Sequence, residues 1–382
     1  MKIVHVIPAM TWDRGGPAQV VAALARHQQR DGHTVTVLTT DQGSRRGERP
    51  IDLPDTVEML RARVWGPDRV AYAPRFAEAA RSQLRDADMM HVHSIFRFPC
   101  LAAVKAAAEI DRPLVIRPCG VLHRYGLQKR SSLVKQWFLR RYGPMYRTAC
   151  KAWHYTSVNE RRDSWPFEHV AGFVAPNGID VEQYAIDRDG AYEAVVSEWP
   201  ECAGYRYVLF LGRLHAKKRL DLLLEAFLEA APNTHKLVIA GPDEGGLWND
   251  LAKRFLTRPE HRQRVIRVGL VTGAKKSRLL AGASLFALAS EHENFGNAVL
   301  ESLAAGTPVL GSSHVDLVTE LASEGLAEVA DLNLAAWKDQ LSSLLPRPPS
   351  EEFVQTARHW IAEHYGWDHV AKLIAREYES LT

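Results

Sequence analysis

The chain of 382 residues contains few cysteines, little net charge and no long apolar run. Its four cysteines show no CxxC spacing, which argues against a metal knuckle or a disulfide framework and favours a reducing compartment. A formal net charge of +3 is too small for a nucleic-acid footprint over the whole molecule, so we expect no nucleic-acid partner. No apolar segment approaches the roughly 20 residues of a membrane span, and the N-terminus does not resemble a signal peptide. These absences predict a cytoplasmic protein.

The sequence alternates between expected strands and expected helices. Short apolar runs are followed by longer amphipathic runs almost from end to end, which indicates βα units and parallel sheets. In the first half we expect strands at 2–7, 34–38, 57–60, 89–93, 114–117, 152–156 and 172–175, and helices at 18–30, 74–85, 99–109 and 131–150. In the second half we expect strands at 207–211, 236–240, 265–268, 284–288 and 307–310, and helices at 220–230, 247–256, 275–280, 297–305, 353–364 and 367–381. The predicted fold class is α/β.

The chain is long for a single hydrophobic core, so two domains are expected. A turn-rich stretch at 176–180 follows a strand and marks the join. We therefore predict domains at 1–176 and 177–365, followed by a C-terminal helical segment at 366–382. Two doubly wound sheets of this kind bind ligands beyond the carboxyl ends of their strands.

The most informative stretch runs from 290 to 310. Glu293 and Glu301 lie eight residues apart around a Phe-Gly-Asn turn that opens a helix, and Gly306 closes that helix where a left-handed cap costs least. A carboxylate, the backbone N–H groups of a helix start and a second carboxylate one turn later could hold a charged, hydroxyl-rich ligand. A sugar nucleotide has this chemistry and is the expected ligand.

Two cations follow the strand expected at 207–211. Arg213 lies at its carboxyl end, and Lys218 lies five residues later, where the next helix should begin. Two fixed cations there could neutralise a pyrophosphate leaving group without a metal. The alternative is a solvated basic turn, because Lys217, Lys218 and Arg219 are adjacent.

Seven segments, taken in order, resemble those of one enzyme family. They are 15–21, 90–94, 174–180, 210–218, 240–246, 293–301 and 366–370. Each falls in the predicted structural context, and as an ordered set they span most of the chain. On these segments the chain is identified as a member of the family-four retaining glycosyltransferases, which have the GT-B fold. The resemblance implies two Rossmann-like domains facing a cleft, the first for the acceptor and the second for the nucleotide sugar, with a last helix that returns to the N-terminal domain.

The resemblance also implies roles for residues of the second domain. Arg213 and Lys218 match the pair that grips the donor diphosphate, and Glu293 matches a glutamate near the donor sugar; these three are the catalytic candidates. Glu301 matches a glutamate that holds the ribose hydroxyls, a task that suits a carboxylate because it can accept two hydrogen bonds. The other donor-binding candidates are Gly241 and a turn whose backbone N–H groups face sugar and phosphate, made of Phe295, Gly296 and Asn297.

In the first domain, Gly15 and Gly16 match a loop that approaches the diphosphate from across the cleft. Glycine suits that place because the backbone must come close and adopts positive φ readily. The alternative is a plain turn between strand and helix.

The sequence departs from the family on the acceptor side. Members often carry a histidine shortly after the strand at 114–117, but Cys119 stands there, and His123 follows four residues later. Cys119 could be an inert small residue, a changed hydrogen-bond donor or a sign of a different register, and no activating arrangement makes it a nucleophile. His93, near the end of its strand, is the third acceptor-side candidate. No metal is expected at His91 and His93, because no third ligand follows at a telling spacing.

The segment 112–159 contains ten arginines or lysines and no aspartate or glutamate, with aromatic residues interleaved. A basic helix with aromatic residues could rest on an anionic membrane and suit a lipid-linked acceptor, which would place the protein at the inner face of the membrane. The alternative is a helix that packs its aromatic residues into the domain and leaves its cations in water.

We therefore expect a retaining glycosyltransferase that moves a sugar from a UDP- or GDP-linked donor to a saccharide or lipid-linked saccharide, in polysaccharide or glycoconjugate biosynthesis. Since GT-B enzymes generally need no metal for their chemistry, no cofactor and no metal is expected. Two alternatives stay open: another GT-B activity, such as sugar-nucleotide epimerisation or donor hydrolysis, and a non-catalytic binding subunit. A Rossmann dehydrogenase is disfavoured, because no GxGxxG follows the first strand.

Overall fold

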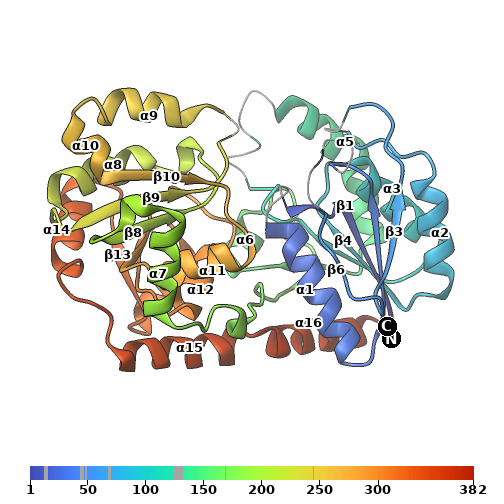
Figure 1. Cartoon of the computed structure of the whole chain (residues 1–382). Helices are drawn as coiled ribbons and strands as arrows, with labels where there is room; N and C mark the ends of the chain where they lie inside the picture. The colour runs from blue at the N-terminus through green and yellow to red at the C-terminus, as the bar shows by residue number, and fades with distance from the viewer. Residues whose placement is uncertain are drawn as a thin grey trace. The chain divides into compact units, whose positions relative to one another are not determined.

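Two parallel β-sheets organise the structure, each in its own part of the chain (Figure 1). The computed structural model describes residues 1–12, 16–43, 47, 50–67, 70–123, 127, 132–167, 169–243 and 245–382. Unit 1 consists of Met1–Gly178 together with Trp367–Thr382, and unit 2 consists of Ile179–Gly366. Among the described residues, no helix combines the length and the apolar character that crossing a bilayer requires.

Unit 1 contains a seven-stranded sheet of order β3-β2-β1-β4-β5-β6-β7, in which every pairing is parallel. Its strands are β1 Lys2–Ala9, β2 Thr34–Thr40, β3 Glu58–Ala62, β4 Met89–His93, β5 Leu114–Arg117, β6 Ala152–Tyr155 and β7 Gly172–Val174. Its helices are α1 Gly16–Arg30, α2 Phe76–Asp86, α3 Phe98–Ile110, α5 Ser132–Ala149, α6 Val158–Asp163 and α16 Trp367–Leu381.

The last helix, α16, is part of unit 1 although almost the whole chain precedes it. Val370, Ile374 and Tyr378 of α16 share one buried cluster with Val20 and Leu24 of α1. This packing agrees with the fold class implied by the resemblance.

Unit 2 contains a six-stranded parallel sheet of order β10-β9-β8-β11-β12-β13. Its strands are β8 Arg206–Leu211, β9 His235–Ala240, β10 Val265–Gly269, β11 Leu285–Leu288, β12 Val309–Ser312 and β13 Ala327–Ala330. Its α-helices are α7 Arg188–Glu198, α8 Leu220–Ala230, α9 Leu247–Phe255, α10 Pro259–Arg264, α11 Gly273–Ala281, α12 Asn297–Ala304, α13 Asp316–Ser323, α14 Leu334–Leu344 and α15 Glu351–Tyr365. Its described residues also form three short 3-10 helices: η3 Val181–Gln183, η4 Pro200–Cys202 and η5 Ala216–Lys218.

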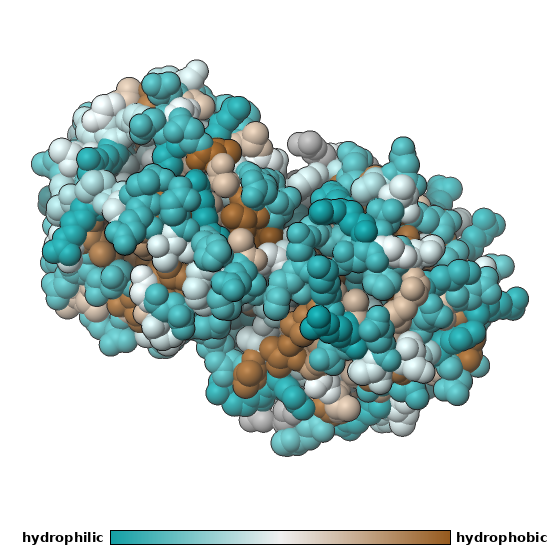
Figure 2. Space-filling model, turned by 90° about the horizontal axis from the view of Figure 1, so that it is seen from below, coloured by the Kyte–Doolittle hydropathy of each residue, from teal (hydrophilic) through white to brown (hydrophobic). Residues whose placement is uncertain are grey.

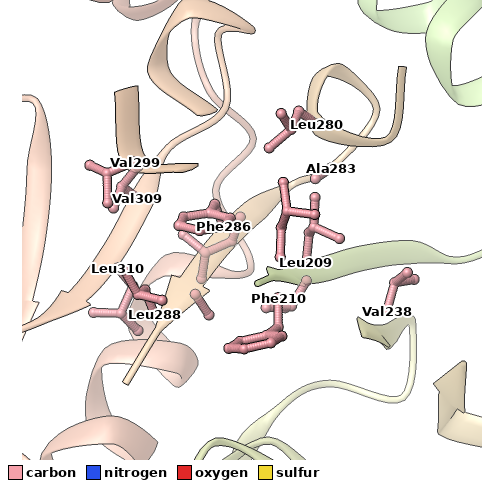
Figure 3. Packing of buried hydrophobic residues seen from close by; sticks show 14 of the residues in the cluster. Leu209, Phe210, Val238, Leu280, Ala283, Phe286, Leu288, Val299, Val309 and Leu310 are labelled. Atoms are coloured by element: carbon pink, nitrogen blue, oxygen red, sulfur yellow. The ribbon is translucent and has the colours of Figure 1, made fainter. Parts of the chain in front are cut away.

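The central strands of unit 2 show the pattern that is typical of a parallel sheet. They are apolar on both faces, because helices cover both faces of a doubly wound sheet. Figure 3 shows Phe286 of β11 between Leu209 of β8 and Val309 of β12, which are its partners in strand register.

The face seen in Figure 2 is mostly hydrophilic, with apolar residues in small separate patches.

Strand order reverses beside the first strand of each sheet. In unit 1, β1 lies between β2 and β4, and in unit 2, β8 lies between β9 and β11. The loops that follow such a pair diverge to opposite faces, which opens a ligand-binding position at the carboxyl ends of the strands. In unit 2 this position lies between the loop after β8 and the loop after β11.

Candidate functional site

The loop after β8 carries Arg213 and Lys218 to the carboxyl end of the unit 2 sheet. The backbone N–H of Gly212 donates to Ala240 O at 3.0 Å, and that of Leu214 donates to Pro242 O at 2.9 Å. These two bonds hold the residue between them, Arg213, which is exposed. An exposed guanidinium at a strand end can reach a ligand.

Lys218 and Glu293 join the two loops through an ion pair between Lys218 Nζ and Glu293 Oε1. The hydroxyl of Ser290 donates to the same carboxylate oxygen at 2.6 Å. The side chain of Lys218 is 13% exposed and that of Glu293 is 11% exposed, so the pair is largely removed from water. A backbone bond from Glu291 N to Lys217 O, at 2.7 Å, fixes the loops beside it.

Glu293 remains ionised in this setting. Burial acts to raise the pKa of Glu293, but the charge of Lys218 and the hydrogen bonds from Lys218 and Ser290 outweigh it, so the pKa lies below its ordinary value of 4.5. The charge of Lys217 acts in the same direction. The other oxygen of Glu293 can therefore act as an acceptor for a sugar hydroxyl at neutral pH.

The Phe-Gly-Asn turn has the form that the sequence suggested. Gly296, with φ 97°, precedes α12 in a left-handed conformation that favours glycine. Phe295 is buried, and its ring lies 6.0 Å from that of Tyr365, so its side chain serves packing. That the backbone N–H groups of this turn face a ligand remains a prediction, as does the donor role of Asn297. Gly306 adopts φ 78° after α12, as expected of a left-handed cap.

Glu301 has a cation of its own. Lys276 Nζ on α11 lies 2.8 Å from Glu301 Oε1, and the two side chains are 12% and 14% exposed. The same ammonium lies 5.5 Å from the ring centre of Tyr184. Neither Lys276 nor Tyr184 is among the residues predicted from the sequence. One signal was present: Lys276 lies in the first turns of its helix, where a cation is unfavourable for the helix dipole.

Gly241 has a structural reason of its own to be glycine. Its φ is 133°, and a Cβ at this position would lie 1.9 Å from Gly212 O. The close crossing of the loops after β8 and β9 thus requires glycine, whatever Gly241 does for the donor. In unit 1, Gly16 begins α1, while Gly15 lies outside the described residues.

A network of buried histidines occupies the corresponding level of the unit 1 sheet. His5 on β1 faces His93 on β4, with 3.1 Å between His5 Nδ1 and His93 Nε2, and Gln28 Oε1 of α1 lies 2.7 Å from His5 Nε2. On the same face, His154 Nδ1 of β6 lies 3.3 Å from His91 Nε2.

The bonds at the ends of the second histidine pair assign its protons. Ala175 O, which can only accept, lies 2.8 Å from His154 Nε2, so that nitrogen carries the proton. His91 Nε2 then donates to His154, and the hydroxyl of Tyr378 donates to His91 Nδ1 at 2.6 Å. Every ring nitrogen of His91 and His154 therefore has a hydrogen-bond partner while both rings are uncharged.

Burial lowers the pKa of each of the four histidines, that of His5 to about 4, and the charge of Arg117 adds to the effect. His5 also supplies a third imidazole beside His91 and His93, with ligand atoms within 4.8 Å of one another. Sequence spacing could not reveal it, because it comes from the neighbouring strand. The guanidinium of Arg117 acts against a cation at this place, and the absence of a metal site remains a prediction.

The acceptor-side candidates have different surroundings. His93 is 1% exposed, and its ring faces that of His5 in the interior. Cys119 has φ 54° and donates from Sγ to Arg117 O at 3.6 Å; burial raises its pKa to about 11, so it is a neutral thiol and not an activated nucleophile. His123 Nε2 lies 3.5 Å from Asp163 Oδ2 on α6. Their roles toward an acceptor remain predictions.

Two family models match the chain. A model described as "Glycosyltransferase Family 4" matches residues 14–183, and one described as "Glycosyl transferases group 1" matches residues 205–346. The chain belongs to the family-four glycosyltransferases. This confirms the resemblance drawn from the seven segments, and the protein is a glycosyltransferase.

Relatives match along nearly the full length. A GDP-mannose:cellobiosyl-diphosphopolyprenol alpha-mannosyltransferase of Xanthomonas oryzae pv. oryzae is 28% identical over 99% of this chain and 96% of its own. A phosphatidyl-myo-inositol mannosyltransferase of Mycobacterium tuberculosis is 24% identical over 100% of this chain and 97% of its own. The crystal structure of Anabaena HepE in complex with UDP and glucose, at 17% identity, has a TM-score of 0.74 and covers all of both chains. This structural likeness confirms the two-domain α/β fold class.

Proposed function

We propose that this family-four glycosyltransferase transfers mannose from GDP-mannose to a polyprenyl-diphosphate-linked saccharide with retention of configuration, in polysaccharide or glycoconjugate biosynthesis. The observation that carries the donor assignment is the joined pair Lys218–Glu293 beside Arg213 at the switch point of the unit 2 sheet. The mannose and the lipid-linked acceptor are proposed from the activity of the Xanthomonas oryzae relative, which is similar over nearly the full length.

Retention follows from the chemistry of these substrates. The mannose of GDP-mannose is α-linked, so a glycosyltransferase that forms an α-mannoside from it retains the configuration. As the bond between the sugar C1 and the diphosphate oxygen breaks, its electron pair leaves with the diphosphate, and the sugar gains oxocarbenium character. The acceptor hydroxyl then bonds to C1 from the same face, and its proton passes to the leaving phosphate. No side chain has to act as a nucleophile.

The residues of unit 2 have distinct tasks in this proposal. Arg213 and Lys218 stabilise the negative charge that develops on the diphosphate, a role that does not need a metal. Glu293 holds the ammonium of Lys218 in place and accepts a hydrogen bond from a sugar hydroxyl. Glu301 accepts hydrogen bonds from the ribose hydroxyls.

Product analysis tests the proposal. The purified protein is incubated with GDP-mannose and a polyprenyl-diphosphate disaccharide, and products are identified by mass spectrometry and by the anomeric configuration of the new linkage. The proposal expects an acceptor enlarged by one hexose in an α-linkage. An altered nucleotide sugar without an enlarged acceptor would favour an epimerase, free mannose a hydrolase, and binding without turnover a non-catalytic subunit. With UDP-glucose in place of GDP-mannose we expect little product.

A membrane-facing surface on unit 1 is the second part of the proposal. Helix α5 exposes three large apolar residues to water: Leu133 is 71% exposed, Val134 75% and Trp137 60%. Such a group of neighbouring exposed apolar residues is unusual on the surface of a soluble domain. Cations lie against neighbouring aromatic rings. Lys135 Nζ lies 5.3 Å from the ring centre of Phe96, and two further cations, Lys105 and Arg141, lie 5.4 and 5.1 Å from that of Tyr142, whose ring is 6.1 Å from that of Trp137.

Exposed apolar groups among cations, in a segment with no acidic residue, are the chemistry of a surface that rests on anionic lipid. Such a contact would bring the enzyme to a lipid-linked acceptor at the inner face of the membrane, where GDP-mannose is available from the cytoplasm.

A further inference from the structure

We infer that Lys276 and Tyr184 are positioning residues that hold the carboxylate of Glu301 in the orientation required to bind the ribose of a nucleoside diphosphate. This inference rests on the proposed function, because it takes Glu301 as the ribose-binding group. Three elements of unit 2 meet at this carboxylate: α12 supplies Glu301, α11 supplies Lys276, and the residue after η3 supplies Tyr184.

The ion pair reaches a single oxygen of the carboxylate. Lys276 Nζ lies 2.8 Å from Glu301 Oε1, and its ammonium also lies 5.5 Å from the ring centre of Tyr184. Lys276 binds one of the two carboxylate oxygens, and a fixed carboxylate presents the other in a defined direction. A ribose offers two adjacent hydroxyls, which match the acceptor sites of one carboxylate.

Tyr184 adds a second constraint. Its side chain is buried, and burial raises the pKa of Tyr184, with the charge of Glu301 and a hydrogen bond to it adding to the rise. The phenol therefore keeps its proton and can donate a hydrogen bond to the carboxylate of Glu301. A ring over the ammonium and a phenol on the carboxylate restrict both partners of the ion pair.

Helix stability alone gives no reason for a lysine at this place. Lys276 is in the N-terminal part of α11, where the helix dipole disfavours a cation, and it is 12% exposed. Its neighbour Lys275 provides the contrast. Lys275 pairs with Glu198 on the exposed side of the helix, with side chains 57% and 38% exposed. Lys276 pairs with a largely buried carboxylate and Lys275 with an exposed one. Lys275→Met is therefore the matched control for Lys276→Met.

Calorimetric titration with GDP and 2′,3′-dideoxy-GDP tests the inference. The wild-type protein should bind GDP about tenfold or more tightly than the dideoxy nucleotide, because the hydroxyls bond to a charged group. In Lys276→Met, affinity for GDP should fall about tenfold while affinity for dideoxy-GDP stays the same, so the ratio approaches one. Lys275→Met should keep both wild-type values, and Lys276→Arg should restore most of the ratio.

Two results would overturn the inference. One is a Lys276→Met protein that keeps the wild-type ratio, and the other is one that weakens both nucleotides equally, which would place Lys276 on another part of the nucleotide. Wild-type protein that binds neither GDP nor UDP would instead overturn the proposed function. Equal affinity of the wild-type protein for GDP and dideoxy-GDP would show that Glu301 does not bind the ribose hydroxyls. The diphosphate site of the proposed function would not be contradicted by that result.

A second variant guards against misfolding. Melting temperatures are measured for every variant. If Lys276→Met does not fold, Tyr184→Phe keeps the ring and removes the hydroxyl, and it should weaken GDP binding a few-fold without changing the dideoxy nucleotide. An unchanged ratio in a folded Tyr184→Phe protein would then overturn the inference.

Discussion

The two units handle buried polarity in different ways. In unit 2, each glutamate of the candidate site has a lysine: Lys218 with Glu293 and Lys276 with Glu301. In unit 1, the polar groups at a similar level of the sheet are histidines that remain uncharged. The buried cation there, Arg117, donates to the neutral side chain of Asn177.

The difference concerns what each site can offer a ligand. Paired charges keep carboxylates ionised and cations in place, which suits a diphosphate and its hydroxyl-bearing neighbours. Uncharged rings such as His91 and His154, which are paired with each other, with Tyr378 and with Ala175 O, mainly support the loops that follow the strands. We therefore expect substitutions in unit 2 to change the chemistry and substitutions in the unit 1 network to change stability.

The largest effect is expected at Lys218. Lys218→Ala removes a cation from the leaving group and leaves Glu293 largely buried without its partner, so kcat should fall about 10²- to 10³-fold. Initial rates of transfer from GDP-mannose measure it, with Lys217→Ala as the neighbouring control, which should stay within several-fold of wild type.

Stability and catalysis separate in a double variant. Lys218→Met with Glu293→Gln removes both charges, so it should recover melting temperature lost in Lys218→Ala without recovering activity. A Lys218→Ala protein with near-native activity would refute the site assignment in unit 2.

The second effect is on the pH dependence of unit 1. The folded-state pKa of His5 is about 4 against an ordinary 6.5, so between these values the unfolded chain binds more protons, and stability falls as pH falls. That gap corresponds to about 3 kcal/mol lost by pH 4 from this ring, and the lowered pKa values of His91, His93 and His154 act in the same direction.

Amide exchange between pH 7 and pH 4.5 tests it, and the strands β1 and β4 should lose protection. The exposed His359, replaced by glutamine, should leave the profile unchanged. Equal protection of unit 1 at both pH values would contradict the description of the network as neutral.

A smaller effect is expected at Glu301. Glu301→Gln keeps the shape but loses the charge, so the KM for GDP-mannose should rise about 10- to 100-fold with a modest change in kcat. Steady-state kinetics measure it, and Glu291→Gln is the control, because Glu291 is more exposed and lies 3.6 Å from Arg219. An unaltered KM would show that the ribose is bound elsewhere.

The smallest effect is expected on the surface of α5. Arg140 is exposed beside Trp137, and Arg140→Ala should weaken binding to vesicles rich in anionic lipid by about 1 kcal/mol, roughly five-fold. Flotation with anionic and with neutral vesicles measures it, and Arg162→Ala in the same unit is the control. Wild-type protein that is indifferent to lipid charge would exclude this surface.

Much of the fold could be predicted because its signals are local. The apolar runs that form β8, β9 and β11 are continuous, and they lie within a residue of the expected ranges. β13 was not predicted, because it is a short edge strand with only Ala330 fully buried. α14 was not predicted either, because its apolar stripe reduces to Trp337 and Leu341.

The candidate site was predicted in part. Lys218, Glu293 and Glu301 could be predicted because they lie in short motifs, 210–218 and 293–301, that can be recognised from neighbouring residues alone. Lys276 and Tyr184 come from elements that precede Glu301 by 25 residues and by more than a hundred. No spacing rule connects such residues, because the intervening strands and helices determine which side chains meet.

By itself, the sequence determined the α/β class, the glycosyltransferase family and the charged residues at the ends of β8 and β11, because apolar periodicity and motif spacing are properties of neighbours along the chain. The tertiary structure decided which lysine meets which glutamate, that His5 joins His91 and His93, and that Gly241 must be glycine to pass Gly212. These depend on contacts across strands and between helices, and such contacts exist only once the sheet order and the helix packing have formed.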